Sequence, residues 1–315
     1  RSMAAATRVL ATTVGPFEHH GELVLRACVK EGTDYLDITG EPLFVQRAID
    51  RYDAEARERG LKIVSCCGFD SIPHDLGVLF TIDRLAPRGP VTIEGIVRSR
   101  GTISGGTWHS AIHAFSNAAE YARMRRQKRR APEGGRRVRG LPPRVRYERE
   151  VGGWIAPLPT IDPEVVLRSA RLLDEYGPDF AYGHYVCVKR LTTLAAGAAV
   201  VSGVVALAQI PPARALLLKV KDPGEGPSEE QRARAWFRVT FLAQSGDRRI
   251  VTEVSGGDPG YGETSKMLAE SALCLALDRE RTPALSGVIT PAAAMGRPLI
   301  ERLTRAGIAF RVVRG

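Results

Sequence analysis

The sequence predicts an α/β protein in which half of a doubly wound parallel sheet is followed by an α+β domain with a mostly antiparallel sheet. Short apolar segments alternate with helix-length segments over residues 8–65, which is typical of parallel βαβ units. After about residue 85 the pattern changes to longer alternating segments and a hairpin. The chain of 315 residues, 44% of them hydrophobic, is long enough to bury a core in each part.

The first domain is expected to cover residues 1–85. Gly32 and Gly60 each follow an apolar helical stripe, where glycine ends helices, and Pro42 stands where a first helical turn tolerates proline. The expected strands are 9–13, 35–38 and 61–65, and the expected helices are 20–30 and 42–60. Ligands of such sheets bind at the carboxyl ends of the strands, which here are Thr12–Phe17, Thr39–Glu41 and Cys66–Ser71.

The second domain is expected to cover residues 86–315. Residues 91–97 alternate like a strand, and residues 236–243 and 249–254 form a hairpin around Ser245-Gly246-Asp247. Helices are expected at residues 105–127, 162–175, 264–278 and 291–306.

A basic segment at residues 123–149 contains twelve Lys or Arg and two Glu, so its net charge of +10 equals that of the whole chain. Gly134-Gly135 and Pro142-Pro143 predict that its second half is a mobile loop. The segment either is a solvated loop or binds an acidic partner such as a carrier protein. Few aromatic residues interleave with the charges, which disfavours a nucleic acid.

Residues 191–213 contain no charge over 23 residues, which as a helix would be long enough to cross a bilayer. Their small residues and Pro211-Pro212 favour a helix that is buried or packs at a subunit interface. A helix lying on lipid, or spanning it, is the alternative.

The five cysteines, without a CxxC pair, indicate that the protein resides in a reducing, cytoplasmic compartment. A cytoplasmic protein can still be associated with a membrane.

Four groups of residues could carry chemistry. Thr12–Phe17 could present backbone amides and hydroxyls to a ribose or nicotinamide, or could be an ordinary turn. Cys67–Asp75 contains Asp, Ser and His side chains that could pass a proton, although Asp70 or Ser71 could simply cap a helix. Residues 101–107 could bring backbone amides to an anion or a substrate oxygen, and residues 182–185 contain Tyr and His.

Two further patterns are weaker. The glycines of residues 255–263 are in the wrong order for a dinucleotide fingerprint, so a structural turn is favoured. The six histidines show no spacing with acids or cysteines that would predict a metal site, although His109 and His113 are four residues apart. No metal is therefore expected.

Several longer motifs together resemble the saccharopine dehydrogenase-like oxidoreductases, and among them most closely the trans-acting enoyl reductases of lipid and polyketide assembly. The resemblance extends over essentially the whole chain. The motifs are residues 12–17, 32–35, 39–41, 67–73, 104–107, 183–185, 223–227, 253–261 and 290–296.

The resemblance implies a Rossmann domain that binds NADP or NAD, then an α+β domain that shapes the substrate pocket and forms a homodimer contact. It implies hydride transfer to a small-molecule or carrier-bound acyl substrate. The candidate cofactor-binding residues are Thr12, Thr13, Val14, Gly15, Pro16, Phe17, Gly40, Glu41, Cys67, Gly68 and Phe69. Gly105, Gly106 and Thr107 are substrate candidates, and Asp70, Ser71, Tyr182 and His184 are the ranked candidates for proton transfer.

Members of this family begin with a strand, a glycine-rich loop and a helix that precede the segment starting here at about Arg8. We therefore expect a partial Rossmann-like parallel sheet that lacks its N-terminal βαβ unit and its pyrophosphate-binding loop. The alternative to a reductase is a non-catalytic, truncated relative that binds an acidic carrier or a lipid surface through the basic segment and the apolar helix.

Overall fold

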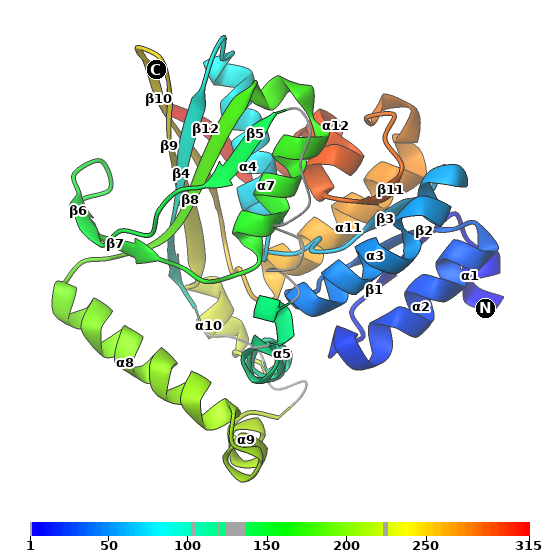
Figure 1. Cartoon of the computed structure of the whole chain (residues 1–315), viewed down its shortest axis with the longest axis horizontal. Coiled ribbons are helices and arrows are strands. Elements are labelled where there is room, and N and C mark those ends of the chain that lie inside the picture. The colour runs from blue at the N-terminus through cyan, green and yellow to red at the C-terminus, as the bar shows by residue number, and fades with distance from the viewer. Residues whose placement is uncertain (1, 102–104, 119, 124–135, 223–225) are drawn as a thin grey trace.

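The parallel sheet of the first domain has four strands in the order β1-β2-β3-β11, as expected for the first three. The computed structural model describes residues 2–101, 105–118, 120–123, 136–222 and 226–315 (Figure 1). The elements of this unit are α1 (Ser2–Ala5), β1 (Val9–Thr12), α2 (Phe17–Glu31), β2 (Asp34–Asp37), α3 (Pro42–Glu58), β3 (Lys62–Val64), β11 (Gly287–Ile289), α11 (Gly262–Leu277) and α12 (Pro291–Arg305).

The fourth strand comes from a distant part of the chain, far beyond the expected boundary at residue 85. Gly287–Ile289 pairs in parallel with Lys62–Val64 although more than 200 residues separate them in the sequence. Helices α2 and α3 cover one face of the sheet, and α11 packs on the other (Figure 1). The second part of the chain thus returns to complete the first unit.

A second sheet of eight strands is mixed and mostly antiparallel, in the order β12-β10-β9-β4-β8-β7-β6 with β5 also paired to β8. Among the described residues, the parallel pairs of this sheet are β4 with β8 and β5 with β8. The hairpin was correctly predicted and is longer than expected. The strands are β4 (Val91–Arg100), β5 (Arg137–Gly140), β6 (Arg146–Glu148), β7 (Gly153–Pro157), β8 (Asp179–Val188), β9 (Trp236–Ser245), β10 (Arg248–Gly256) and β12 (Ala309–Arg314).

Helix α4 (Ile72–Leu85) joins the two sheets, because it leaves the end of β3 and packs on β9 and β10. It is buried along almost its whole length, and its polar residues His74, Asp75 and Thr81 are buried with the apolar ones. One hydrophobic core runs from Leu36 and Val64 of the parallel sheet through Leu76 to Phe180 and Phe241 of the mixed sheet. The two sheets are therefore held in a fixed relation at the site described below.

The remaining helices confirm one expectation in part and correct another. The helix expected at 105–127 begins as α5 at Gly105 and ends at Ser116. After a turn at Asn117, Ala118 and residues 120–123 are again helical, and residues 124–127 lie outside the described residues. The apolar segment is not one buried helix, because it forms an exposed α8 that is followed by α9. The other bounds are α7 (Asp162–Leu172), η1 (Asp174–Tyr176), α8 (Leu191–Ala208), α9 (Pro211–Leu218), α10 (Glu229–Ala233) and η2 (Arg279–Arg281).

The second half of the basic segment is not a mobile loop, since residues 137–140 and 146–148 are strands β5 and β6. Arg146 explains part of the difference, because its guanidinium donates to both carboxylate oxygens of Glu94, at 3.0 and 2.7 Å, and to Glu148. Arg136 donates to the backbone carbonyls of Leu173 and Ala170. Arg136 and Arg146 therefore stabilise the fold and do not belong to a solvated loop. Residues 124–135 lie outside the described part of the chain.

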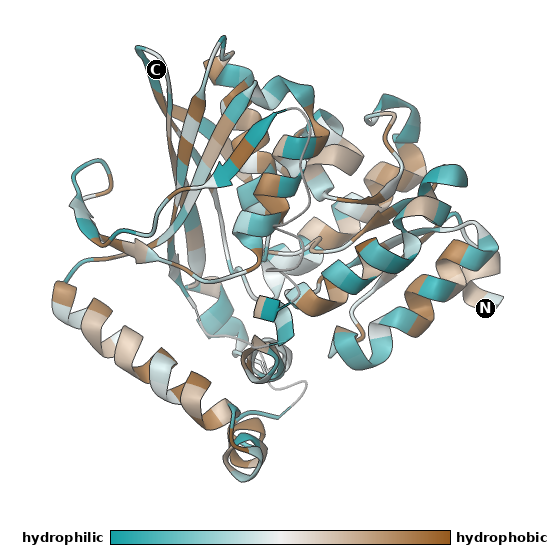
Figure 2. Ribbon diagram, in the orientation of Figure 1, coloured by the Kyte–Doolittle hydropathy of each residue, from teal (hydrophilic) through white to brown (hydrophobic). Residues whose placement is uncertain are grey.

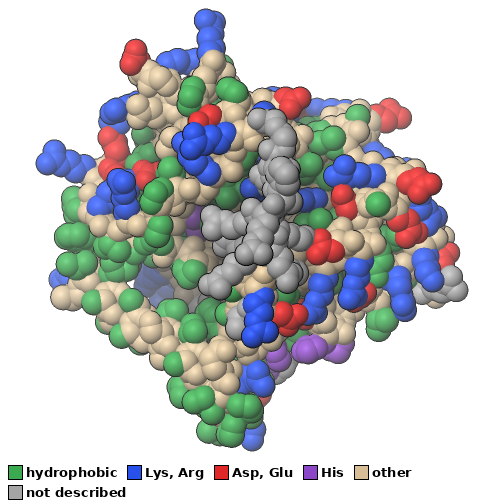
Figure 3. Space-filling view, viewed as in Figure 1, with side chains coloured by type: hydrophobic (Ala, Val, Ile, Leu, Met, Phe, Trp, Pro, Cys, Tyr) green, Lys and Arg blue, Asp and Glu red, His purple; other side chains and the backbone are tan. Residues whose placement is uncertain are grey.

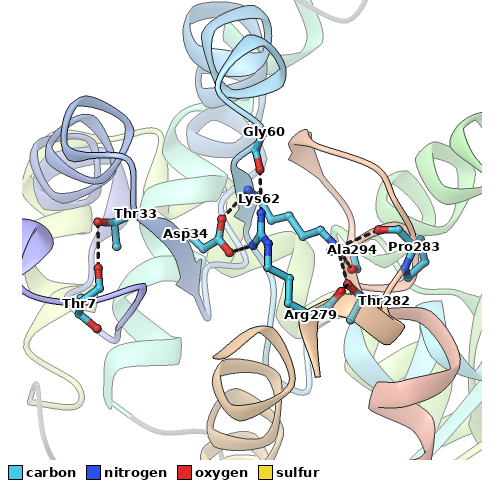
Figure 4. Close-up of polar contacts among 9 residues, drawn as sticks. All are labelled: Thr7, Thr33, Asp34, Gly60, Lys62, Arg279, Thr282, Pro283 and Ala294. Atoms are coloured by element: carbon cyan, nitrogen blue, oxygen red, sulfur yellow. Dashed lines mark hydrogen bonds and ion pairs between the residues drawn. The ribbon is translucent and has the colours of Figure 1, made fainter. Parts of the chain in front are cut away.

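The buried Lys62 connects the parallel sheet to residues 282–294, the returning segment that contains β11 (Figure 4). The ammonium of Lys62 donates to Thr282 Oγ1 at 2.6 Å and to the carbonyls of Pro283 and Ala294, both at 2.8 Å. Burial lowers the pKa of Lys62 to about 8. Within α12, the carbonyl of Ala294 would normally accept from residue 298, which is a proline without an N–H. Lys62 supplies the donor that Pro298 cannot.

Candidate functional site

Three loops meet at the carboxyl ends of β1, β2 and β3, as the parallel sheet requires. Asp37, fully buried at the end of β2, ties two of them together. Its carboxylate accepts from the backbone N–H groups of Thr39 at 2.9 Å and Cys66 at 3.2 Å, and from the Ser65 hydroxyl at 2.8 Å. Burial raises the pKa of Asp37 to about 6. This buried carboxylate thus holds the loops after β2 and β3 together.

The loop between β3 and α4 is strained at both ends. Cys66 and Ser71 have φ angles of 64° and 135°, where non-glycine residues are uncommon. The Ser71 side chain is 0% exposed, and its hydroxyl has no hydrogen-bond partner among the described residues. It stands at the N-cap position of α4 without making the cap hydrogen bond, so the capping role that the sequence allowed for Ser71 is not its role here. Strain and a buried hydroxyl without a partner among the described residues together make Ser71 a candidate functional position.

Ser71→Ala is therefore expected to leave the free energy of unfolding within about 0.5 kcal/mol of the parent, because no protein hydrogen bond is lost. It should lower kcat/KM by about tenfold if the hydroxyl bonds to substrate or cofactor. Ser169, also fully buried, is the matched control, because its hydroxyl donates to Asp75 at 2.5 Å. Ser169→Ala should cost about 1–3 kcal/mol of stability. Urea unfolding and steady-state kinetics check both, and equal stability losses would contradict this assignment.

A buried polar cluster lies beneath this loop, where α4, α7 and β8 converge. Nδ1 of His74 is 2.9 Å from Oδ1 of Asp162, and Nε2 of His184 is 3.5 Å from Oδ2 of the same carboxylate. The Tyr182 hydroxyl lies 3.2 Å from Nδ1 of His184. The two imidazole rings pack edge to face with centroids 4.8 Å apart. The cluster forms a continuous path from the start of α4 to the centre of the mixed sheet.

The charges of this cluster follow from burial and from its one carboxylate. Burial alone would raise the pKa of Asp162, but the imidazoles of His74 and His184 outweigh it and hold that pKa below its usual range. Burial lowers the pKa of His184 to about 4 and raises that of Tyr182 well above its ordinary value. At neutral pH the cluster therefore contains an ionised Asp162, a neutral His184 and a neutral Tyr182.

Asp70 is the acid of the site that retains contact with solvent. Burial of its carboxyl, followed by the negative charge of Asp162, raises the pKa of Asp70 to about 6. A Cβ on Gly40 would lie 3.2 Å from Oδ2 of Asp70, so the β2–α3 loop passes directly against this carboxyl. A carboxyl with a pKa near neutrality, on a partly exposed residue next to a buried charge cluster, is suited to proton transfer.

Metal binding is the other chemistry that the cluster suggests, and the sequence did not predict it. Potential ligand atoms of His74, Asp162 and His184 all lie within 4.8 Å of one another. Neighbouring ligands of a tetrahedral zinc ion are separated by about 3.3 Å, given metal–ligand bonds of about 2.0–2.1 Å. The 2.9 Å contact between His74 and Asp162 is shorter than that and favours a direct imidazole–carboxylate pair.

The candidate cofactor-binding residues divide into two sets. Thr13, Val14 and Gly15 are exposed at the end of β1, while Thr12, Pro16, Gly40 and Phe69 are partly exposed. Thr12 Oγ1 accepts from the Val14 N–H at 3.2 Å. Phe17, Glu41, Cys67 and Gly68 are buried, so these four shape the loops from within.

Glu41 has a defined structural role at this edge. Its carboxylate accepts from the backbone N–H groups of Phe17 and Glu18 at 3.0 and 2.8 Å, at the positive N-terminal end of α2. It also accepts from the Ser110 hydroxyl of α5 at 2.9 Å. Glu41 thus connects the β1–α2 loop, the β2–α3 loop and α5.

The three substrate candidates stand at the beginning of α5. Gly105 is buried, whereas Gly106 and Thr107 are exposed. Residues 102–104, which belong to the same motif, lie outside the described residues. Because Ser110 fixes α5 on Glu41, the first turn of α5 borders the same edge as the three loops.

The structure brings Asp70, Ser71, Tyr182 and His184 into one region and adds His74 and Asp162. His74 was visible in the sequence as part of the polar run after β3, one helical turn beyond Asp70. Asp162 was not, because it reads only as the first residue of a helix. A separate cavity of about 360 Å³, lined by Arg98, Arg238 and Glu253 among others, lies on the mixed sheet and contains none of these residues.

Comparison with known proteins identifies the class. The chain is 38% identical to a candidate trans-acting enoyl reductase of Mycobacterium tuberculosis, over 100% of this chain and 82% of that protein. It is 33% identical to the trans-acting enoyl reductase of Mycobacterium ulcerans, over 99% and 82%. It is 30% identical to the human saccharopine dehydrogenase-like oxidoreductase, over 99% and 79%. The protein is therefore an oxidoreductase.

More particularly, the chain belongs to the saccharopine dehydrogenase-like oxidoreductases, the family that its motifs resemble. Its fold is similar to that of saccharopine dehydrogenase from Saccharomyces cerevisiae, with a TM-score of 0.52 at 10% identity over 99% of this chain and 86% of that one. No family model matches the sequence.

Proposed function

We propose that this protein is a nicotinamide-dependent reductase that saturates the double bond of an enoyl thioester in lipid or polyketide metabolism. The observation that carries the proposal is the partly exposed Asp70, whose pKa is raised to about 6. It stands beside the unpartnered hydroxyl of Ser71 at the strand ends of a chain in this family. The names of the related enoyl reductases support the choice of substrate.

The residues at this edge fit a nicotinamide cofactor. Thr13, Val14 and Gly15 offer an exposed hydroxyl, an apolar side chain and backbone at the end of β1. The Ser71 hydroxyl, buried and without a partner among the described residues, would bond to an amide or carbonyl oxygen after a shift of the loop that follows β3. When bound in its reduced form, the cofactor supplies the hydride. We propose NADP rather than NAD as the cofactor, following the resemblance to the family.

The protein's own contribution is the proton and its position. Reduction of an enoyl thioester adds a hydride to the β-carbon and a proton to the α-carbon. We assign the proton to Asp70, which is protonated in part of the population near neutral pH and can recover a proton from solvent. Asp162 and His74 fix the charge environment of Asp70.

The assay combines the protein with NADPH or NADH and 2-enoyl thioesters of increasing chain length, and follows the loss of reduced nicotinamide. Oxidation that requires the thioester, and that is faster with NADPH, is the expected result. Quenching of cofactor fluorescence measures binding separately from turnover. Cofactor binding without oxidation on any thioester would refute the enoyl substrate, and absence of binding by both cofactors would refute the reductase itself.

A further inference from the structure

Helix α8 is apolar and exposed over nearly its whole length. It extends 18 residues from Leu191 to Ala208 with a mean hydropathy of 2.0, yet only 6% of it is buried inside the structure. In Figure 1 it stands away from the body, and Figure 2 shows it in brown and white between its ends. Val200 and Val201 are 66% and 47% exposed and Leu207 is 45% exposed. Such a surface is costly in water and indicates an interaction site.

The short helix α9 continues this surface and adds positive charge. Leu216 and Val220 are 67% and 68% exposed, and Figure 3 shows hydrophobic side chains gathered over α8 and α9 along the lower left of the molecule. From Lys189 to Lys221 the chain contains no acidic residue. Its basic residues flank the apolar stretch on both sides and are Lys189, Arg190, Arg214, Lys219 and Lys221.

Both ends of this surface are attached to the same body. Helix α8 follows β8 directly, and at its other end the Gln209 side chain donates to the Phe115 carbonyl of α5 at 2.7 Å. The Trp108 indole donates to the Leu217 carbonyl at 2.7 Å, and His109 bonds to the Lys221 carbonyl at 2.9 Å. A helix tied at both ends to one domain lies along a membrane surface more readily than it crosses the membrane.

We propose that α8 and α9 form a docking surface for an anionic lipid bilayer, with α8 lying in the boundary between headgroups and acyl chains. A protein partner would contact one face of a helix, whereas α8 is apolar all round and exposed except at Leu194, Val204, Val205 and Ala208, which fits immersion in lipid. The basic residues at both ends fit anionic headgroups, which attract them electrostatically.

This surface is coupled to the candidate active site through α5. Trp108 and His109 bind α5 to α9, and Ser110, the next residue along the helix, donates to Glu41 at the edge of the parallel sheet. Docking would therefore place that edge near a source of apolar acyl chains.

The test is co-sedimentation of the protein with vesicles of phosphatidylcholine, alone or mixed with phosphatidylglycerol. We expect binding to the anionic vesicles that weakens steeply as salt is raised. Replacing Lys189, Arg190 and Lys219 together with Gln should weaken it by about fivefold for each residue.

Matched variants separate insertion from general surface effects. Val200→Glu and Leu216→Glu should each weaken binding by at least about tenfold. Leu23→Glu and Leu277→Glu, at positions that are 64% and 66% exposed on α2 and α11, should not change it. Equal binding by all four variants, or no binding to anionic vesicles, would overturn the proposal. So would a stable dimer in the absence of lipid that Val200→Glu dissociates, because α8 would then pack against a second copy.

Discussion

Asp70→Asn is expected to lower kcat by about 10²–10⁴-fold, the usual contribution of a positioned general acid. The amide keeps the size of the carboxyl against Gly40 but has no acidic proton to deliver. Cofactor binding should change little, because Asn occupies the same place in the loop. Kinetics with an enoyl thioester, together with cofactor fluorescence, measure the two effects. Asp174→Asn, on the fully exposed side chain of η1, is the control and should match the parent.

The pH dependence of the parent follows from the same residue. The pKa of Asp70 is raised to about 6, so the protonated form that donates is lost as the pH rises through that value, and kcat should fall. In Asp70→Asn this limb of the profile should disappear. An unchanged kcat, or an unchanged limb near pH 6, would exclude Asp70 as the donor and would leave Ser71, Tyr182 and His184 as the remaining candidates.

The same pKa shift costs stability. Between the ordinary pKa of Asp, 3.8, and the raised value of about 6, the folded protein binds more protons at Asp70 than the unfolded chain does. The stability contributed by this group therefore falls as the pH rises through that window and stays low above it. Asp70→Asn should accordingly gain stability relative to the parent at pH 7 but not at pH 4. Such an exchange of stability for activity is common at functional sites.

Lys62→Met is expected to lower the free energy of unfolding by about 2–5 kcal/mol. Methionine fills a similar volume but removes the donor from three acceptors (Figure 4). The Ala294 carbonyl is the acceptor most affected, because it loses its hydrogen bond and Pro298 offers no alternative N–H within α12. The loss should detach β11 and the start of α12 from the parallel sheet.

Urea denaturation followed by circular dichroism measures this effect. Lys189→Met, at an exposed position, is the matched control and should stay within about 0.5 kcal/mol of the parent. A loss below about 1 kcal/mol for Lys62→Met would mean that water can satisfy the three acceptors, and that the returning segment does not depend on this lysine.

The sequence was sufficient for the elements whose signals are local. Alternation of strands and helices up to Ser65 predicted the parallel sheet, and turn residues predicted the hairpin of β9 and β10. It could not predict β11, because a strand of three residues carries little pattern and its partner is remote in the sequence. It mistook the strands at residues 137–140 and 146–148 for part of a loop, since an arginine that pairs within the fold, as Arg146 does with Glu94, looks no different in sequence from a solvated one.

The site was predictable in outline for a similar reason. Strand ends in a parallel sheet meet at one edge, so the loops were found, and the polar run after β3 pointed to Asp70 and Ser71. The strain at Ser71 and the convergence of Asp162 on His74 depend on tertiary packing. The exposure of α8 was also hidden, because a buried and an exposed apolar helix can share the same composition.

The most direct test of the central claim, that this edge of the sheet carries out a reduction assisted by Asp70, follows the atoms that are transferred. The parent and Asp70→Asn are incubated with NADPH that carries deuterium at its reactive carbon and with a 2-enoyl thioester, and the product is analysed by mass spectrometry and NMR. We predict one deuterium at the β-carbon, a solvent-derived proton at the α-carbon, and a strongly reduced yield with Asp70→Asn. Recovery of a thioester without deuterium from the reaction of the parent protein would contradict the account. Equal yields of the deuterated product from the two proteins would contradict it as well.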